Sequence, residues 1–168
     1  MQSGIFTSFM AQALILAEQA QKLGEVPVGA VVVKHGKIIG KGHNQPRSTH
    51  DPSAHAEIAA IREACLNLES DRLEGCDLWV TLEPCTMCAG AIAHARIERL
   101  YYGAVDPKGG AVESGVRFFQ QSTCHHVPEV YSGINEVQAS SLLKEFFKSR
   151  RGQDSSEQTA QPHPDSCD

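Results

Sequence analysis

The sequence predicts an α/β fold, a three-layer α-β-α sandwich in which helices cover both faces of a central mixed sheet. Two observations support this prediction. Strand-like and helix-like runs alternate along the chain, and 168 residues with 41% hydrophobic content suffice for one domain with a substantial core. Histidine, glutamate and cysteine side chains also stand near helix starts, where open sheets place their ligands.

The elements can be assigned in chain order. Apolar residues at a period of 3.6 indicate helices, and short apolar runs bounded by turn residues indicate strands. The expected elements are a helix over 7–23, strands over 28–33 and 37–43, a helix over 55–68, a strand over 77–82, a helix starting at Pro84, a strand over 99–103 and a helix over 136–151.

Turn residues separate these elements. Gly24 ends the first helix, and His35-Gly36 joins the first two strands. Asp51 and Ser53 are both available as the N-cap of the helix that begins near residue 55. Residues 104–134 are rich in glycine and polar groups, so we expect this segment to be irregular.

Two short motifs indicate the chemistry. His55-Ala56-Glu57 and Pro84-Cys85-Thr86-Met87-Cys88 together spell H-x-E … P-C-x-x-C. His55, Cys85 and Cys88 are three zinc ligands, whereas a structural zinc takes four, so one position is left for water. Glu57 would move a proton between that water and a leaving nitrogen. The pattern predicts zinc-dependent hydrolytic deamination.

Helix starts explain how these residues can share one site. Residues two apart point to nearly opposite sides of a helix interior, so His55 and Glu57 can meet only at a first turn. Pro84 suits a helix start because its missing N–H costs nothing there. Cys85 and Cys88, three residues apart, then share a face, and the positive ends of two helix dipoles would favour thiolates.

Each motif by itself has a more ordinary interpretation. A lone C-x-x-C is more often a redox pair or half of a structural zinc site, but no thioredoxin-like context surrounds Pro84. Cys124-His125-His126 suggests a second metal but lacks a partner at ligand spacing. A four-cysteine site needs a second C-x-x-C, which the other cysteines do not form: Cys65, Cys76, Cys124 and Cys167.

Charge is distributed unevenly. The net charge is −5, yet the chain before residue 152 has 15 basic and 16 acidic residues. Residues 152–168 are polar and acidic, so we expect a deaminase domain over 1–151 followed by a disordered tail. Basic residues cluster just before that tail: Lys144, Lys148, Arg150 and Arg151. Taken alone, this cluster fits favourable charge at a helix C-terminus better than an RNA contact.

Composition also bears on the compartment. No stretch reaches transmembrane length, and the N-terminal segment lacks the features of a signal peptide. Six cysteines, two of them in the zinc motif, do not form a disulfide framework. We therefore expect a cytoplasmic protein that does not contact a membrane.

Residues 6–151 resemble the bacterial tRNA-specific adenosine deaminases, a branch of the zinc-dependent cytidine deaminase superfamily, for which the H-x-E … P-C-x-x-C signature is established. The resemblance is carried by VPVGAVVV, GHNQPR, DPSAHAEI, LWVTLEPCTMCAGAI, YYGAVDPKGGAVESG and LLKEFFKSRR. Deaminases in general share the zinc motifs, whereas the GHNxP, GAxDxKxGA and FFxxRR patterns are more particular to the tRNA-editing branch. The resemblance implies a five-stranded mixed sheet of the cytidine deaminase type, one zinc ion per chain and a homodimer.

The resemblance also implies a substrate, the wobble adenosine (position 34) of an arginine tRNA, which is converted to inosine. Glu57 is then the proton shuttle, Asn44 resembles the amide that hydrogen-bonds the flipped adenine, and Val28 and Leu82 resemble the apolar pocket wall. The implied contacts to the ribose, the phosphates and the anticodon loop are Asp106, Lys108, Phe146, Phe147, Arg150 and Arg151.

The chemistry of these residue types agrees with such roles, because amides suit purine edges, lysines suit phosphates, and aromatic and arginine surfaces suit splayed bases. Simpler interpretations exist: Asn44 and Asp106-Pro107 also suit turns, and Phe146 and Phe147 also suit a core.

Two other functions share the zinc motif. A small-molecule deaminase of the guanine or cytosine type would use the same metal site with a closed pocket and would not need a basic helix end. A non-enzymatic zinc module that binds RNA would lack Glu57 or keep a fourth ligand. Because Glu57 is present, the first alternative is the stronger one.

Overall fold

Short apolar runs in the computed structural model, which describes residues 6–157, form one mixed sheet in the order β2-β1-β3-β4-β5. β1 pairs antiparallel with β2 and β3, whereas β3, β4 and β5 run parallel. The strands are β1 (Gly29–Lys34), β2 (Lys37–His43), β3 (Cys76–Leu82), β4 (Arg99–Ala104) and β5 (Glu129–Tyr131). This confirms the five-stranded mixed sheet.

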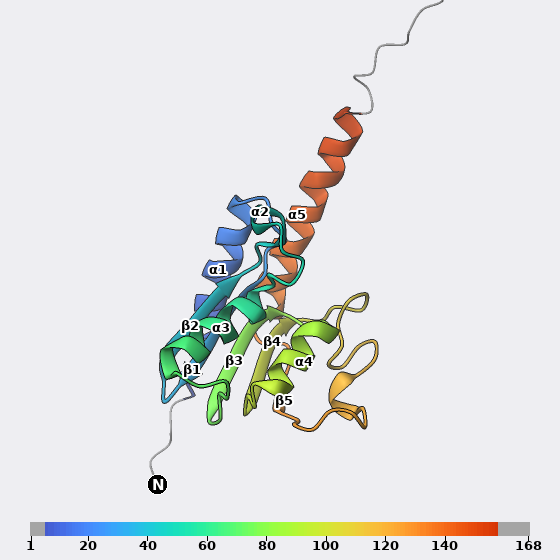
Figure 1. Ribbon diagram of the computed structural model, residues 1–168. Coiled ribbons are helices and arrows are strands. Elements are labelled where there is room, and N and C mark those ends of the chain that lie inside the picture. Colours follow the sequence, from blue (N-terminus) through green and yellow to red (C-terminus); the bar gives the residue numbers. More distant parts are fainter. Residues whose placement is uncertain (1–5, 158–168) are drawn as a thin grey trace, which may run out of the picture.

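Helices cover both faces of this sheet, which confirms the three-layer sandwich (Figure 1). α1 and α5 contact each other on one face, and α3 and α4 contact each other on the other. The helices are α1 (Met10–Lys22), α2 (Pro46–Thr49), α3 (Ala56–Leu68), α4 (Thr86–His94), the 3-10 turn η1 (Phe118–Gln120) and α5 (Glu136–Glu157). No helix among residues 6–157 is long and apolar enough to cross a membrane.

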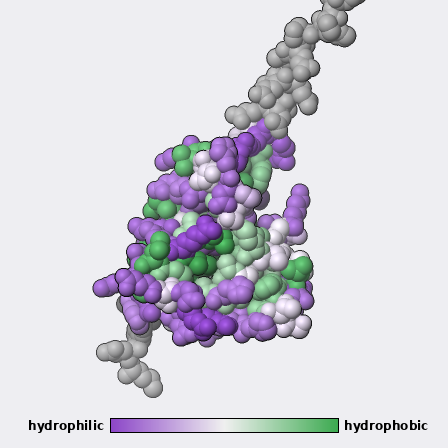
Figure 2. Space-filling model, in the orientation of Figure 1, coloured by the Kyte–Doolittle hydropathy of each residue, from purple (hydrophilic) through white to green (hydrophobic). Residues whose placement is uncertain are grey.

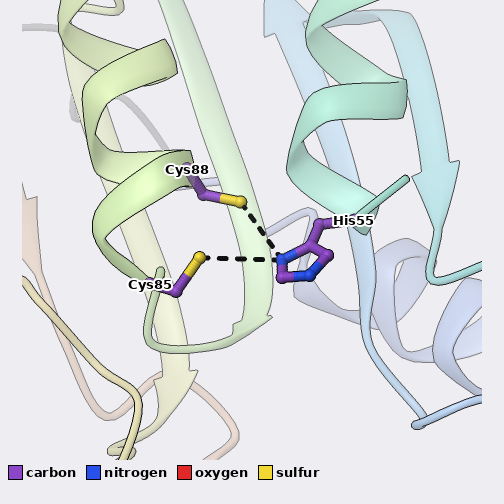
Figure 3. A group of neighbouring side chains, drawn as sticks. All are labelled: His55, Cys85 and Cys88. Atoms are coloured by element: carbon purple, nitrogen blue, oxygen red, sulfur yellow. Dashed lines mark hydrogen bonds between the residues drawn. The ribbon is translucent and has the colours of Figure 1, made fainter. Parts of the chain in front are cut away.

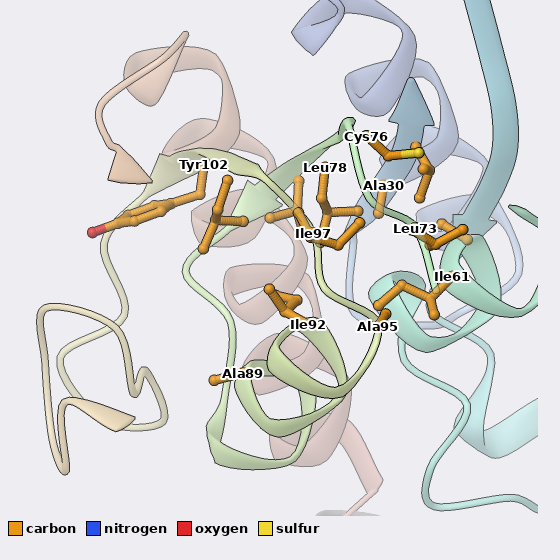
Figure 4. Packing of buried hydrophobic residues seen from close by; sticks show 14 of the residues in the cluster. Ala30, Ile61, Leu73, Cys76, Leu78, Ala89, Ile92, Ala95, Ile97 and Tyr102 are labelled. Carbon is orange, nitrogen blue, oxygen red and sulfur yellow. The ribbon is translucent and has the colours of Figure 1, made fainter. Parts of the chain in front are cut away.

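The main core lies between the sheet and the pair α3 and α4 (Figure 4). Leu78 on β3, Ile92 on α4 and Leu100 on β4 are fully buried there. α3 approaches β2 closely because β2 carries glycines on that side: a Cβ at Gly40 or Gly42 would lie 2.2 Å from a carbonyl oxygen of α3. This contact fixes the height at which α3, and with it His55, stands over the sheet.

Three details differ from the sequence-based expectation. The loop after Asn44 contains the short helix α2, and the segment 104–134 contains η1 and the edge strand β5. β5 has only three residues and pairs with a distant part of the chain, so no local period reveals it. α5 continues to Glu157 rather than ending at Arg151. The rest of the predicted tail, residues 158–168, lies outside the described residues.

Candidate metal centre and substrate pocket

The predicted metal ligands occupy two helix starts. His55 is the N-cap of α3 and Cys85 the N-cap of α4, both with extended backbone (φ −77°, ψ 155° and φ −73°, ψ 175°). Their side chains therefore leave the helix ends rather than the helix sides, and Cys88 follows one turn into α4 (Figure 3). This confirms the expectation that His55 acts from a helix end.

The three side chains converge. His55 Nδ1 lies 3.6 Å from Cys85 Sγ and 3.5 Å from Cys88 Sγ, and all ligand atoms lie within 4.8 Å of one another (Figure 3). One imidazole and two thiols, drawn together without a fourth protein ligand among residues 6–157, suit a catalytic zinc site.

Electrostatics favours the ionised form of one ligand, Cys85. The hydrogen bond with Cys88, together with one from His55, lowers the pKa of Cys85 to about 4, so this side chain is a thiolate at neutral pH. The same pairing with Cys85 raises the pKa of Cys88. The contact with Cys85 also raises the pKa of His55. A thiolate already formed is a ready ligand for a divalent metal.

Glu57 lies in the first turn of α3, two residues after His55. Its side chain is buried, at 4% exposure, and burial raises its pKa to about 7. A carboxyl group with this pKa both accepts and donates a proton near neutral pH. The arrangement therefore provides an acid–base group next to the metal ligands.

The start of α3 is capped from a distance. Asn44 Oδ1 accepts a hydrogen bond from Ala56 N at 2.9 Å, a role that we had expected Asp51 or Ser53 to fill. Those two residues instead bond each other, with Ser53 N and Oγ donating to Asp51 Oδ1 at 2.8 and 2.7 Å. The local pattern could not reveal this because the cap comes from twelve residues upstream.

A pocket of about 410 Å³ adjoins the ligands. It is lined by predicted residues from both motifs and from the predicted pocket wall: Val28, Asn44, His55, Glu57, Leu82, Cys85 and Asp106. It is also lined by Glu83, whose position before Pro84 suggests a role beside the metal, and by residues that we did not predict: Glu25, Val26, Pro46, Arg47 and Gly109. Arg47 could have been predicted from the sequence, because it is a basic residue close to the GHN segment. No sequence feature indicates the buried Glu25.

A larger groove of about 980 Å³ shares Val26, Leu82, Asp106 and Gly109 with this pocket. Its remaining lining comes from the loop after β4 and from α5: Val105, Lys108, Leu143, Lys144, Phe147, Arg150 and Arg151. The structure therefore brings most of the predicted substrate-binding residues to two adjoining depressions that share part of their lining.

Two of the residues on α5 differ from the expectation. Phe146 is buried at 6% exposure and lines neither depression. Arg150 partly serves the fold: its Nη2 donates to Gly24 O at 2.6 Å, and its guanidinium lies 5.0 Å from the centre of the Phe146 ring. Of the two phenylalanines, Phe147 is the one that faces the groove.

The side chains of Cys124 and His126 both contact backbone carbonyl groups. Cys124 Sγ donates to His126 O at 3.1 Å, and His126 Nε2 lies 2.6 Å from Ile97 O. Within residues 6–157, the group formed by His55, Cys85 and Cys88 is the one cluster with three metal-ligand side chains.

Known proteins share both the motifs and the fold. The profile of the cytidine and deoxycytidylate deaminase zinc-binding region matches residues 6–104. The chain is 59% identical over 145 residues to a tRNA-specific adenosine deaminase from Agrobacterium fabrum, covering 86% of this chain and 95% of that protein. It is 43% identical over 143 residues to the one from Bacillus subtilis, covering 85% and 89%.

Solved structures of deaminases share the fold of this chain. A structure from a study of A-to-I editing by tRNA:A34 deaminases at the wobble position matches with a TM-score of 0.79 and 60% identity, covering 80% of this chain and 98% of that one. A guanine deaminase from Bacillus subtilis matches with a TM-score of 0.58 and 34% identity, covering 85% and 92%. The chain therefore belongs to the cytidine and deoxycytidylate deaminase family of zinc-binding proteins and, within it, to the tRNA-specific adenosine deaminases.

Proposed function

We propose that this protein hydrolytically deaminates the wobble adenosine of a tRNA, which yields inosine and ammonia. The observation that carries the proposal is a buried carboxyl group, Glu57, beside a three-ligand zinc centre in a pocket that adjoins a groove lined by lysine and arginine. The names of the relatives, tRNA-specific adenosine deaminases, support the same substrate class.

Glu57 would perform the proton transfers. Zinc held by His55, Cys85 and Cys88 would act as a Lewis acid that lowers the pKa of water. With a pKa of about 7, the Glu57 carboxylate would take one proton from the attacking water and deliver it to ring nitrogen N1, and would then carry the second water proton to the amino nitrogen, which leaves as ammonia. The water oxygen becomes the carbonyl oxygen of inosine, so the atoms balance.

Asn44 would recognise the adenine base through the NH2 group of its side-chain amide. Its Oδ1 already accepts the hydrogen bond from Ala56 N, which leaves the Nδ2 hydrogens to donate. A purine ring offers acceptor nitrogens to such a donor. Val28 and Leu82 line the same pocket and would contact the faces of the ring.

The groove would hold the nucleotides on either side of the flipped base. Lys108 and Arg151 suit phosphates, and Phe147, which is 48% exposed, suits stacking with an unpaired base. A deaminase of free guanine or cytosine would not need this basic groove. The groove therefore favours the polynucleotide substrate over the small-molecule alternative.

The identity of the tRNA and the oligomeric state are inferred from the family. We propose an arginine tRNA as the substrate and a homodimer as the assembly. In support of the dimer, large apolar side chains are exposed at Leu66 on α3, Met87 on α4 and Val116, and apolar surface gathers over these helices (Figure 2).

We also propose a cytoplasmic location. The described cysteines, from Cys65 to Cys124, form no disulfide bond with one another, which supports a reducing environment.

The test is product analysis on matched substrates. Zinc-loaded protein is incubated separately with an arginine anticodon stem-loop that contains adenosine 34, with the same stem-loop carrying guanosine 34, and with free guanine, cytosine and adenosine. We expect inosine from the first stem-loop only. Efficient deamination of free guanine or cytosine, with the stem-loop untouched, would refute the tRNA assignment and leave only a zinc deaminase.

A further inference from the structure

Glu83 is a buried carboxylate that the proposed chemistry does not use. It immediately precedes the Pro84-Cys85 turn, is 2% exposed and lines the pocket. Its position next to a metal-ligand turn favours a role in supporting the ligands. Its hydrogen bonds instead run to a different segment, the loop after β4.

The carboxylate accepts five hydrogen bonds from this loop. Oε1 accepts from the backbone N–H groups of Val112, Glu113 and Ser114 at 3.2, 2.9 and 2.8 Å. Oε2 accepts from Asp106 N and from Ser114 Oγ, both at 2.9 Å. Burial by itself would raise the pKa of Glu83, but these bonds hold it below its ordinary value. One side chain therefore satisfies four backbone amides of one loop.

Other contacts tie the same loop to the turn that carries Cys85. Ala111 N donates to Pro84 O at 2.9 Å, and Gly110 forms an isolated β-bridge with Cys85. The fit is close, because a Cβ at Gly110 would lie 2.5 Å from the carboxyl carbon of Glu83. The loop and the metal-ligand turn are thus built against one another, with the carboxylate between them.

The loop carries two residues that the proposed function uses. Asp106 and Lys108 both line the groove, and Asp106 Oδ1 accepts from Lys108 N at 3.1 Å and from Gly109 N at 3.0 Å. Asp106 N is in turn held by Glu83. The conformation of this short turn therefore depends on the carboxylate beneath it.

We propose that Glu83 is a positioning residue that fixes the 106–114 loop against the Pro84-Cys85 turn, so that Asp106 and Lys108 meet the substrate backbone at a set distance from the metal ligands. This inference rests on the proposed function, because it assigns the loop to binding of the polynucleotide. Glu83 would act through this loop rather than directly on the substrate.

Glu83→Gln tests the inference. The amide keeps the size of the side chain but turns one acceptor into a donor that faces N–H groups. We expect amide hydrogen exchange at Val112–Ser114 to accelerate at least tenfold and KM for the stem-loop to rise at least tenfold. We expect kcat to fall less than threefold, with one zinc per chain retained. Glu18→Gln removes the same charge from an exposed site on α1, across the sheet, and should change none of these quantities.

Ser114→Ala provides a milder variant, since it removes only one of the five donors. It should raise KM two- to threefold, and it decides the question if Glu83→Gln does not fold. Unchanged loop exchange and unchanged KM in the folded variants would overturn the inference, and so would loss of zinc, because Glu83 would then support the metal.

Exchange rates and zinc content are measured without RNA. They therefore test the role of Glu83 even if the wild-type protein leaves the stem-loop unmodified, an outcome that would refute the proposed function alone.

Discussion

At the scale of single residues, hydrogen bonding decides which buried carboxyl groups can transfer protons near neutral pH. Glu57 and Glu83 are both buried, at 4% and 2% exposure. Five donors hold the pKa of Glu83 low, whereas burial is the dominant influence on Glu57 and raises its pKa to about 7. Hydrogen bonds thus separate a structural carboxylate from a proton-transfer group.

Replacing Glu57 by Gln should retain the zinc and the fold but reduce turnover by several orders of magnitude, because the amide cannot carry the proton. The measurements are zinc content, melting temperature and single-turnover inosine formation. Glu69→Gln, at the exposed C-cap at the far end of α3, is the control. Near-normal turnover in zinc-loaded Glu57→Gln protein would remove Glu57 from the mechanism.

At the scale of elements, two helix starts build the metal centre, and the packing of α3 on β2 fixes one of them. Gly42 stands where a Cβ would lie 2.2 Å from Ala56 O, in the first turn of α3. The metal site therefore depends on a residue that never contacts it.

Gly42→Ala should lower the free energy of unfolding by about 1–3 kcal/mol, as overpacking does. It should also speed the loss of zinc to a chelator, because the added methyl group would push α3, and with it His55, away from α4. Thermal unfolding and chelator kinetics test this. Gly152→Ala, where a Cβ would meet nothing within 4 Å, is the control and should leave both unchanged. Equal zinc retention in the two variants would show that α3 relaxes without moving its ligand.

The helix α5 carries two lysines that can be compared in a test of RNA binding. Lys144 lines the groove, whereas Lys148, one turn later on the same helix, does not. Lys144→Ala should weaken stem-loop binding and reduce the slope of log K against log salt by about 1, as expected for the loss of one phosphate contact. Lys148→Ala should change the slope much less, and equal slopes would argue against the groove as the RNA path. Arg150 is a poor probe by comparison, because it also holds Gly24.

At the scale of the whole molecule, the three-layer body is distinct from the end of α5, which projects beyond it (Figure 1). Residues 152–157 read GQDSSE and offer no apolar side chain to bury. We therefore continue to expect that folding depends on 1–151.

A chain ending at Arg151 should melt within about 1 °C of the full chain, since a 1 kcal/mol loss would lower the midpoint by roughly 2–4 °C. It should also bind RNA slightly more tightly, because four acidic residues that follow the basic pair Arg150-Arg151 in the sequence are removed: Asp154, Glu157, Asp165 and Asp168. A chain ending at Glu157 retains two of these residues and should be intermediate. A midpoint several degrees lower after truncation would show that the removed segment stabilises the body.

The sequence by itself determined the alternation of strands and helices and the two helix starts. It also determined the group of metal-ligand side chains formed by His55, Cys85 and Cys88. Local spacing and helix geometry specify each of these features. Only the tertiary structure decided that β5 completes the sheet and that Phe147, not Phe146, faces the groove. It also decided two hydrogen-bonding partnerships. Asn44 caps α3 from twelve residues away, and Glu83 holds a loop 23 to 31 residues distant. Contacts between such separated segments form only when the sheet brings them together, so no periodicity along the chain records them.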